Sequence, residues 1–584
     1  MARLHPADPR FRLAALRPSN HAARGTDGGS NDGAASDGSV LASRAVDRRQ
    51  LLRSAGAAGA AIALGAPAWS CRTAGTASAP VTDARAGAPP TTDHDRDTEL
   101  ALLALDAARS TGARYADVRV SRHRFESIAA REDRVTGVGG AESYGLGVRA
   151  LYGGSWGFAG VPEPTRESAA DAGRRAARIA AANDRVAPGR VELAAVERQV
   201  DVAWTTPHRI DPFSIAPEAK ADLLLAANAA ALGVRGVSFV ESGIDSVRES
   251  RLLATSEGSI VRQTFVRLDP SLTVTAVSAD RGDFQSRVGD IEPAGRGWEY
   301  VVGLDLAERA RGWAEEAVEA LAAPAVEPGT WDLVLHPSHL WLTIHESIGH
   351  PTELDRALGY EANYAGTSFL APPERVLGSL RLGPEWMTMM ANRTEEGGCA
   401  TCGWDDEAVP AEAWPLVRDG VFVDYQTTRE QVADIAALTG VERSHGCSYA
   451  QDWRSIPFPR MPNVSLLPGD EDLSEDDVVA AVDRGILVHG RGSYSIDQQR
   501  YNFQFGGQAF WEIRGGRRTR MLRDVAYVGR TPDFWRSMVL LGGPRTYYLG
   551  ASFADAKGQP TQLNAVSHGC PVALFRGVQV LHAR

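Results

Sequence analysis

Helix-like and strand-like patterns alternate irregularly along residues 97–325, and this order constrains the fold more than any other feature of the sequence. Residues 99–108 have the spacing of a helix, 115–120 alternate like a strand, and 144–159 read as two strands around Gly153-Gly154, a pair suited to a hairpin turn. Helices are also expected at 167–183, 217–232 and 306–321, and strands at 238–246, 251–256, 260–267 and 271–278. Because the strand–helix–strand rhythm of a doubly wound sheet is missing, the sequence predicts an α+β fold.

A chain of 584 residues is too long for one compact domain. The Pro- and Gly-rich stretch at 324–329 is a natural boundary, because such residues interrupt helices and strands. We expect a leader and linker at 1–95, a mixed N-terminal α+β domain with hairpins at 96–325, and a β-rich C-terminal domain at 326–584.

The composition excludes several classes of protein. Lys and Arg number 62 against 73 Asp and Glu, a net charge of −11, which is unsuited to wholesale nucleic-acid binding. Five cysteines are too few for a disulfide-rich scaffold. Apart from the leader, no segment reaches the 18 or so apolar residues of a membrane span.

The N-terminal leader carries a recognisable pattern. Arg48-Arg49-Gln50-Leu51-Leu52, followed by the weakly apolar run at 54–68, resembles a twin-arginine export signal. This resemblance predicts an exported, extracytoplasmic protein, with Cys71 as a candidate site of lipid attachment. The alternative is a basic patch in an unstructured tail, which would leave the protein in the cytoplasm.

A pair of histidines around a glutamate follows a short strand-like run at 331–335. Pro337-Ser338 opens a helix, with Ser338 a candidate N-cap, and the helix leads into His345-Glu346-Ser347-Ile348-Gly349-His350. Imidazole nitrogens bind Zn²⁺, and an adjacent carboxylate takes a proton from metal-bound water. Five positions correspond to about 500° of α-helical rotation, which points the two imidazoles apart.

The five-residue spacing leaves three interpretations open. A π-type turn would bring His345 and His350 together, and Gly349 would ease that distortion. A regular helix would instead pair Glu346 with His350 as ligands. By spacing alone, two unrelated histidines are the simpler interpretation.

Several segments in the same order resemble the TldD/PmbA family of metallopeptidases, specifically the TldD-type subunit that carries H-E-x-x-x-H. They are the 144–159 hairpin, His345–His350, 363–368, 404–407, 456–463 and 567–571. The resemblance implies zinc bound by His345, His350 and Cys570, with Glu346 as the catalytic base. Family members often continue past this Cys through a Gly-Lys and Gly-Gln stretch, whereas this chain continues as Pro571-Val572. His568 and Cys447 are the rival third ligands.

The resemblance also implies a C-terminal catalytic domain that carries the metal-binding helix, and assembly as a homodimer or as a heterodimer with a sister TldD/PmbA-type subunit. The leading hypothesis is a zinc metallopeptidase that hydrolyses unfolded or extended peptides. One alternative is a non-catalytic peptide-binding subunit, although such subunits lack the motif that this chain keeps. The other is a zinc hydrolase of a different amide, in a modified peptide or a cell-wall fragment.

Four further groups are candidates for subsidiary roles. Arg460 and Asn463 are candidate substrate-binding residues, with a buried ion pair the alternative for Arg460. The acidic run 405–407 would touch substrate or support the site, but a solvated turn is favoured. Cys399 and Cys402 form either a local disulfide or two free thiols.

Overall fold

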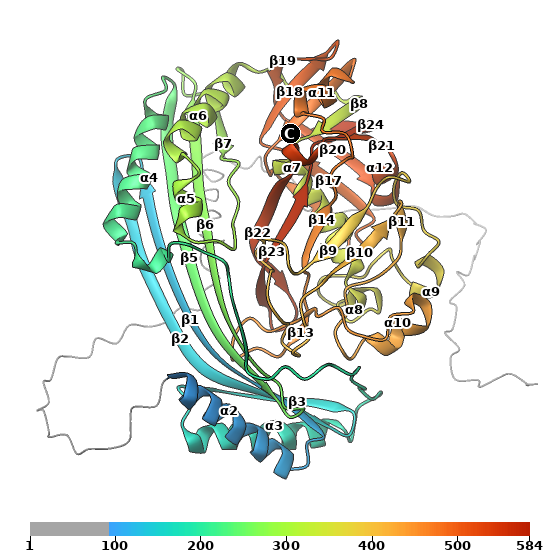
Figure 1. The fold of residues 1–584 in the computed structure, drawn as a ribbon. Coiled ribbons are helices and arrows are strands. Elements are labelled where there is room, and N and C mark those ends of the chain that lie inside the picture. Colours follow the sequence, from blue (N-terminus) through green and yellow to red (C-terminus); the bar gives the residue numbers. More distant parts are fainter. Residues whose placement is uncertain (1–92, 584) are drawn as a thin grey trace, which may run out of the picture. The chain divides into compact units, whose positions relative to one another are not determined.

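The computed structural model describes residues 93–583, and Figure 1 shows their fold. Arg48-Arg49, the apolar run at 54–68 and Cys71 lie outside the described residues, so export and lipid attachment stay predictions. Within residues 93–583, no helix is both long and apolar enough to cross a membrane. The combination of helices with several sheets confirms the predicted α+β fold.

One long-stranded sheet dominates the N-terminal half. Strands β3, β2, β1, β5, β6 and β4 are consecutive neighbours, and β7 also pairs with β6. The predicted Gly153-Gly154 turn joins β2 to β3, and Gly153 has the positive φ of 60° that such a turn needs. The strands are β1 Tyr115–Arg131, β2 Arg134–Tyr152, β3 Ser155–Pro162, β4 Val202–Thr205, β5 Val237–Thr255, β6 Ile260–Val277 and β7 Phe284–Val288.

Strands β5 and β6 are each longer than expected, because each joins two of the predicted strands. Pro270 lies inside β6, opposite Ile244 of β5. On the other side of β6, β4 pairs with 261–264 and β7 with 273–277. Pro270 falls between these two partners, so its missing N–H interrupts neither ladder.

Two sets of helices pack on different parts of this sheet (Figure 1). Helices α2 and α3 share a core with β1, β2 and β3, and α4 and α6 share another with β5 and β6. Helix α4 has the predicted bounds, because Pro217 begins it and Gly233 follows its last residue. The helices are α2 Asp93–Ser110, α3 Arg166–Asn183, α4 Pro217–Leu232, α5 Trp298–Val302 and α6 Leu306–Ala322.

A mixed nine-stranded sheet forms the centre of the C-terminal half. Its order is β16, β17, β20, β24, β8, β15, β18 and β19, with β21 also paired to β24. Strand β8 is parallel to β15 and antiparallel to β24. The bounds are β8 Gly329–Leu335, β15 Arg484–His489, β16 Tyr494–Ile496, β17 Asn502–Gly506, β18 Ala509–Arg514, β19 Arg517–Leu522, β20 Val525–Arg530, β21 Met538–Leu541 and β24 Ala573–His582.

Helix α7 (Pro337–Ile344) follows β8 directly and packs against a separate two-stranded ribbon of β22 (Tyr548–Lys557) and β23 (Gln562–Cys570). A four-stranded sheet lies in the order β11, β10, β9, β14. The remaining elements are β9 Met389–Asn392, β10 Ala413–Arg418, β11 Val421–Phe422, β12 Ser448–Tyr449, β13 Phe458–Pro459, β14 Asn463–Leu466, α8 Leu354–Ala357, α9 Pro373–Val376, α10 Val432–Thr439, α11 Glu475–Ala480 and α12 Thr531–Arg536.

The acidic run at 405–407 is buried, so the solvated turn favoured from the sequence is wrong. Asp406 forms an ion pair with Arg251 of β5, and Glu407 pairs with Arg149 of β2 at 2.9 Å. Both carboxylates are at most 2% exposed. Because buried charges need partners, these arginines of the N-terminal sheet account for the acidic run.

Candidate metal centre

The helix that carries the histidine motif changes its winding at the motif. Helix α7 ends at Ile344, and 345–349 form a π-helical turn closed by a hydrogen bond from the His350 N–H to the His345 carbonyl. The predicted π-type turn is therefore confirmed. It brings the imidazole rings of His345 and His350 to a centroid distance of 4.6 Å.

Gly349 allows the chain to pass close to a neighbouring side chain. A Cβ at this position would lie 2.5 Å from Sδ of Met461. Pro351 then begins a short 3₁₀ turn at 350–352. The π-helical turn thus ends at Gly349, directly before the 3₁₀ turn.

Three acidic or imidazole groups converge beside this turn. Possible ligand atoms of His345, Glu346 and His350 all lie within 4.8 Å of one another, and all three residues are buried. A further carboxylate, that of Asp555 on β22, lies between the histidines: its Oδ1 is 3.5 Å from Nε2 of His345 and 3.6 Å from Nε2 of His350. Asp555 was not among the residues predicted from the sequence.

Hydrogen bonds fix which nitrogen of His345 carries the proton. The Val464 carbonyl lies 2.9 Å from Nδ1 of His568, so Nδ1 of His568 is the donor and its Nε2 is an acceptor. Nε2 of His568 lies 2.7 Å from Nδ1 of His345, which must donate. Burial and the neighbouring His345 lower the pKa of His568 well below its usual value, in agreement with this neutral form. Nε2 of His345 is left with a free lone pair.

The Glu353 carboxylate fixes the position of the ring proton of His350. Glu353 Oε2 accepts a hydrogen bond from Nδ1 of His350 at 2.9 Å, so Nε2 of His350 keeps its lone pair when the ring is neutral. Burial lowers the pKa of His350, but Asp555 and Glu353 outweigh burial and raise that pKa above its usual value. Glu353 is completely buried and also binds Arg356 at 3.1 Å and Lys557 at 3.0 Å. Burial opposes its charge, but Lys557, Arg356 and His350 together hold the pKa of Glu353 well below its usual value.

Asp555 is held from its far side by Arg460. A guanidinium nitrogen of Arg460 binds Oδ2 of Asp555 at 2.9 Å and the Asp555 carbonyl at 2.7 Å. Burial opposes the charge of Asp555, but His350 and His345 hold its pKa well below the usual value. An ionised carboxylate oxygen therefore faces the Nε2 atoms of the two imidazoles.

Glu346 faces the same centre from the π-helical turn, and Arg500 approaches it. Nε of Arg500 lies 3.6 Å from Oε2 of Glu346, and within the described residues this buried N–H has no hydrogen-bond partner. Arg500 has a φ of 61° in the loop between β16 and β17. The Asp497 carboxylate fixes that loop by accepting the backbone N–H groups of Gln499, Tyr501 and Asn502.

The other residues singled out from the sequence lie away from the histidines or already have hydrogen-bond partners within the protein. Cys570 Sγ lies 3.7 Å from the Pro337 carbonyl at the start of α7, and the structure does not bring it to the histidines. The amide of Asn463 is taken up by backbone groups and by Thr401. Arg460 is bound to Asp555 and to the Gln562 carbonyl, the buried ion pair left open above. Cys399, Cys402 and Cys447 are free, buried thiols.

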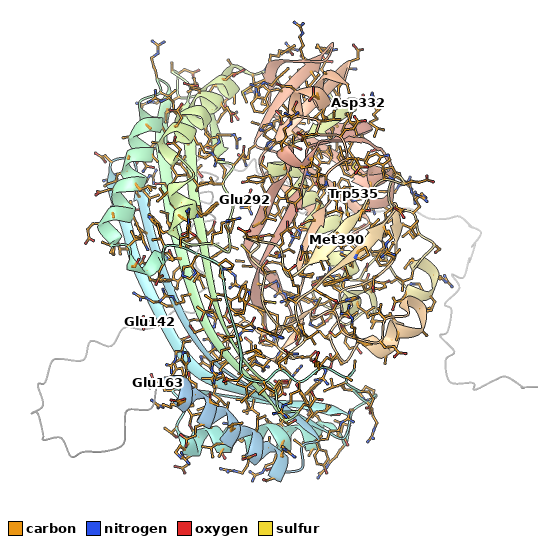
Figure 2. All side chains as sticks on the ribbon, in the orientation of Figure 1. Glu142, Glu163, Glu292, Asp332, Met390 and Trp535 are labelled. Atoms are coloured by element: carbon orange, nitrogen blue, oxygen red, sulfur yellow. The ribbon has the colours of Figure 1, made fainter. Side chains whose placement is uncertain are left out.

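Trp341 of α7 connects this centre to the N-terminal half. Its ring stacks on that of His568 with centroids 6.1 Å apart, and its Nε1–H donates to Glu292 at 3.1 Å. Glu292 lies beside β22 (Figure 2), where the Ala551 N–H approaches its carboxylate at 3.4 Å. Burial, with a smaller opposing effect of Arg491, raises the pKa of Glu292 to about 8.

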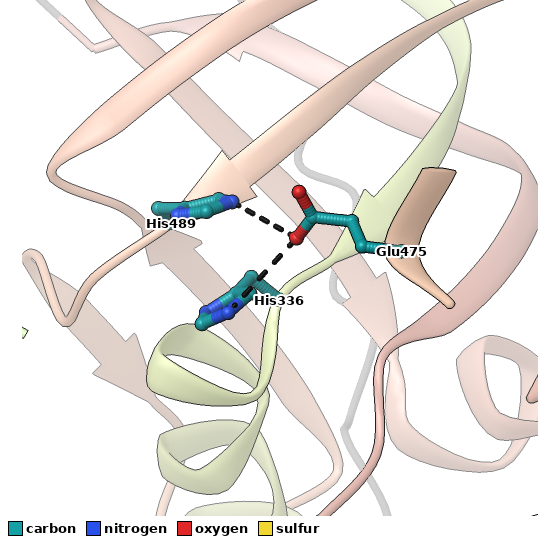
Figure 3. A group of neighbouring side chains, drawn as sticks. All are labelled: His336, Glu475 and His489. Atoms are coloured by element: carbon teal, nitrogen blue, oxygen red, sulfur yellow. Dashed lines mark hydrogen bonds and ion pairs between the residues drawn. The ribbon is translucent and has the colours of Figure 1, made fainter. Parts of the chain in front are cut away.

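A second group of two histidines and a carboxylate lies at the first residue of α7 (Figure 3). Glu475 is 3.1 Å from Nε2 of His489 and 3.9 Å from Nε2 of His336. Nδ1 of His336 caps α7 by accepting the Ser338 N–H, so His336 and not Ser338 is the N-cap. Neutral His336 therefore carries its proton on Nε2, which a metal would need free. We interpret this group as a helix cap held by a carboxylate.

Comparison with known proteins identifies the family. The PmbA/TldA metallopeptidase models match at 116–180 for domain 1, 210–323 for the central domain and 328–582 for the C-terminal domain. A metalloprotease of Methanothermobacter thermautotrophicus is 28% identical over 80% of this chain and 95% of its own. A metalloprotease TldD homolog of Buchnera aphidicola is 22% identical over 78% and 91%.

Solved structures show the same fold. TldE of Thermococcus kodakarensis matches with a TM-score of 0.60 and 15% identity over 82% of this chain and 98% of its own. A protein of Thermotoga maritima matches with a TM-score of 0.65 and 16% identity over 84% and 100%. With three family models covering most of its length, the chain belongs to the PmbA/TldD family of metallopeptidases.

Proposed function

We propose that this chain is a zinc-dependent peptidase that hydrolyses unfolded or extended peptides, with His345 and His350 as metal ligands and Glu346 as the general base. One observation carries the proposal: the π-helical turn and the two Nδ1 hydrogen bonds direct both Nε2 lone pairs to one point beside the Glu346 carboxylate. Neutral imidazoles oriented through Nδ1 are the usual form of histidine metal ligands.

The residues present fit a catalytic metal, because nitrogen and oxygen donors meet in one buried place. A bound Zn²⁺ would polarise the peptide carbonyl and make water a better nucleophile at neutral pH. Glu346 would accept the proton of the attacking water and return it to the leaving amine nitrogen. His568 and Glu353 would keep His345 and His350 in the required tautomers.

Two alternatives make different forecasts. A non-catalytic peptide-binding subunit would bind peptides without cleaving them, and the retained motif counts against it. A hydrolase of another amide would use the same metal ligands and base and differ only in substrate. Digestion of an unfolded peptide library with mass-spectrometric detection separates the proposed peptidase from both alternatives.

Variants at Glu346 test the mechanism. Glu346→Gln keeps the size of the side chain but removes its basicity, so we expect hydrolysis to fall by at least about 10²-fold. Zinc content, measured by elemental analysis, should stay near that of the wild type. The matched control is Glu385→Gln, whose carboxylate is 88% exposed. Hydrolysis that survives in Glu346→Gln would refute the role of Glu346 as the base.

We also propose assembly as a dimer, either of this chain or with a sister TldD/PmbA-type subunit, and export through the Arg48-Arg49 signal. The fold shared with TldE supports the first proposal, and the sequence pattern supports the second. Light scattering that shows an active monomer would refute dimerisation. Fractionation that finds the wild-type protein in the cytoplasm, with its leader uncleaved, would refute export.

A further inference from the structure

We infer that Asp555 supplies the third protein ligand of the metal, so that every protein donor is nitrogen or oxygen and no thiolate takes part. This inference rests on the proposed metal-dependent function. It replaces the Cys570 ligand that the family resemblance implied.

The distances around Asp555 match ligand spacing better than direct hydrogen bonding. Oδ1 lies 3.5 and 3.6 Å from the two Nε2 atoms. Direct N–H···O bonds to a carboxylate have heavy-atom distances of about 2.7–2.9 Å. Neighbouring donors around a tetrahedral ion with bonds of about 2.0–2.1 Å lie about 3.3 Å apart.

The positions of the protons on the two imidazoles also favour Asp555 as a ligand. Nδ1 of His345 donates to His568, and Nδ1 of His350 donates to Glu353, so in the neutral rings neither Nε2 has a proton to give to Asp555. Two nitrogen lone pairs and an anionic oxygen thus face one another in a buried place. Such an arrangement is unfavourable unless a positive charge, either a metal ion or a proton on one imidazole, lies between the three atoms.

Contacts with Arg460 hold the Asp555 carboxylate in one orientation, as metal binding requires. Arg460 binds Oδ2 and the main-chain carbonyl of the same residue, which leaves Oδ1 directed at the histidines. Arg460 is only 1% exposed, so this contact is part of the packed interior. Outer contacts of this kind orient ligating carboxylates.

The described cysteines do not reach this centre. Cys570 Sγ contacts the carbonyl of Pro337, which precedes His345 by eight residues, or about 12 Å of helix. None of the four described cysteines belongs to the group of ligand atoms at His345 and His350.

A carboxylate in this position has two chemical consequences. Oxygen is a harder donor than sulfur, so the site should also accept Co²⁺ and Mn²⁺. A centre without a thiolate has no sulfur to be oxidised to sulfenic or sulfinic acid, so peroxide should not release the metal through a ligand.

Metal content and the spectrum of the Co²⁺ form test the assignment in the full-length protein. We expect Cys570→Ser to bind zinc like the wild type, and Asp555→Ala to lose at least about tenfold in zinc affinity. The Co²⁺ wild type should lack the near-ultraviolet thiolate charge-transfer band. Asp555→Cys should bind Co²⁺ and gain that band, which keeps the inference testable even if Asp555→Ala misfolds.

A thiolate band in the wild type, loss of zinc in Cys570→Ser, or a folded Asp555→Ala that binds zinc like the wild type would overturn the inference. These readouts are independent of hydrolysis. A wild type that binds metal through Asp555 but cleaves no peptide would refute the proposed function and leave the ligand assignment standing. A folded wild type that binds no metal would overturn both.

Discussion

The buried carboxyl group of Glu292 should make the stability of this protein depend on pH. Glu292 is 7% exposed, and burial raises its pKa to about 8 from the usual value of 4.5. Between these two values the folded protein holds a proton that the unfolded chain releases. Stability should therefore be highest below pH 4.5, as far as this group decides it, and should fall as pH rises to about 8.

The size of the effect follows from the shift. One bound proton gives a slope of up to about 1.4 kcal/mol per pH unit, and the difference between 4.5 and about 8 corresponds to roughly 4–5 kcal/mol. Glu292→Gln is neutral at every pH and keeps an acceptor for the Trp341 N–H. We expect the variant to resemble the wild type near pH 5 and to exceed its stability by a few kcal/mol at pH 8.

Urea unfolding at pH 5, 6, 7 and 8 measures this difference. The experiment needs a chelator throughout, because metal binding itself depends on pH. Glu385→Gln, which removes an exposed carboxylate, is the control and should follow the wild type at every pH. If the difference in unfolding free energy between wild type and Glu292→Gln does not change from pH 5 to 8, the reasoning is refuted.

Two further changes test the support of the metal centre. Glu353→Ala removes the hydrogen-bond acceptor of His350 and leaves Lys557 without one of its buried partners. We expect the free energy of unfolding, measured by denaturation, to fall by about 3–5 kcal/mol, and zinc binding, measured by calorimetry, to weaken by about 10–100-fold. Zinc binding like that of the wild type would contradict the role of Glu353. Gly349→Ala places a Cβ 2.5 Å from Met461 Sδ and should cost about 1–3 kcal/mol in thermal unfolding. Adding Met461→Ala should recover part of that loss, and a simple sum of the two single losses would show that the contact is not the cause.

Local patterns predicted the helices of this fold better than its strands. Helix α4 begins at Pro217 and ends before Gly233, as the signals in the sequence indicated. The sequence predicted two strands, at 260–267 and 271–278, where the structure has the single strand β6 with Pro270 inside it. Only the sheet topology shows that, on the side of β6 away from β5, Pro270 falls between the segments that pair with β4 and β7. Propensity alone could not supply that information.

Some residues of the candidate metal centre were predictable from the sequence, and others were not. His345, Glu346 and His350 are neighbours in the sequence, so their chemistry and the need for a π-type turn were predictable. Asp555 comes from a strand about 200 residues later and was missed, because a single carboxylate carries no local signature. A signal did exist: Lys557-Gly558-Gln559 follows Asp555 closely and resembles the stretch expected after the ligand cysteine.

The contacts around the centre show why residues distant in sequence decide its chemistry. The ribbon β22–β23 supplies Asp555, which faces both histidines, and His568, which fixes the tautomer of His345. Lys557 of the same ribbon binds Glu353, the residue that orients His350. The π-helical turn therefore provides two imidazoles and a base, but their protonation depends on how the ribbon packs against α7. Arg460, a candidate substrate-binding residue, forms an ion pair with Asp555. The geometry of the candidate metal centre is thus a property of the packed ribbon and helix together, which explains why the H-E-x-x-x-H motif alone left three interpretations open.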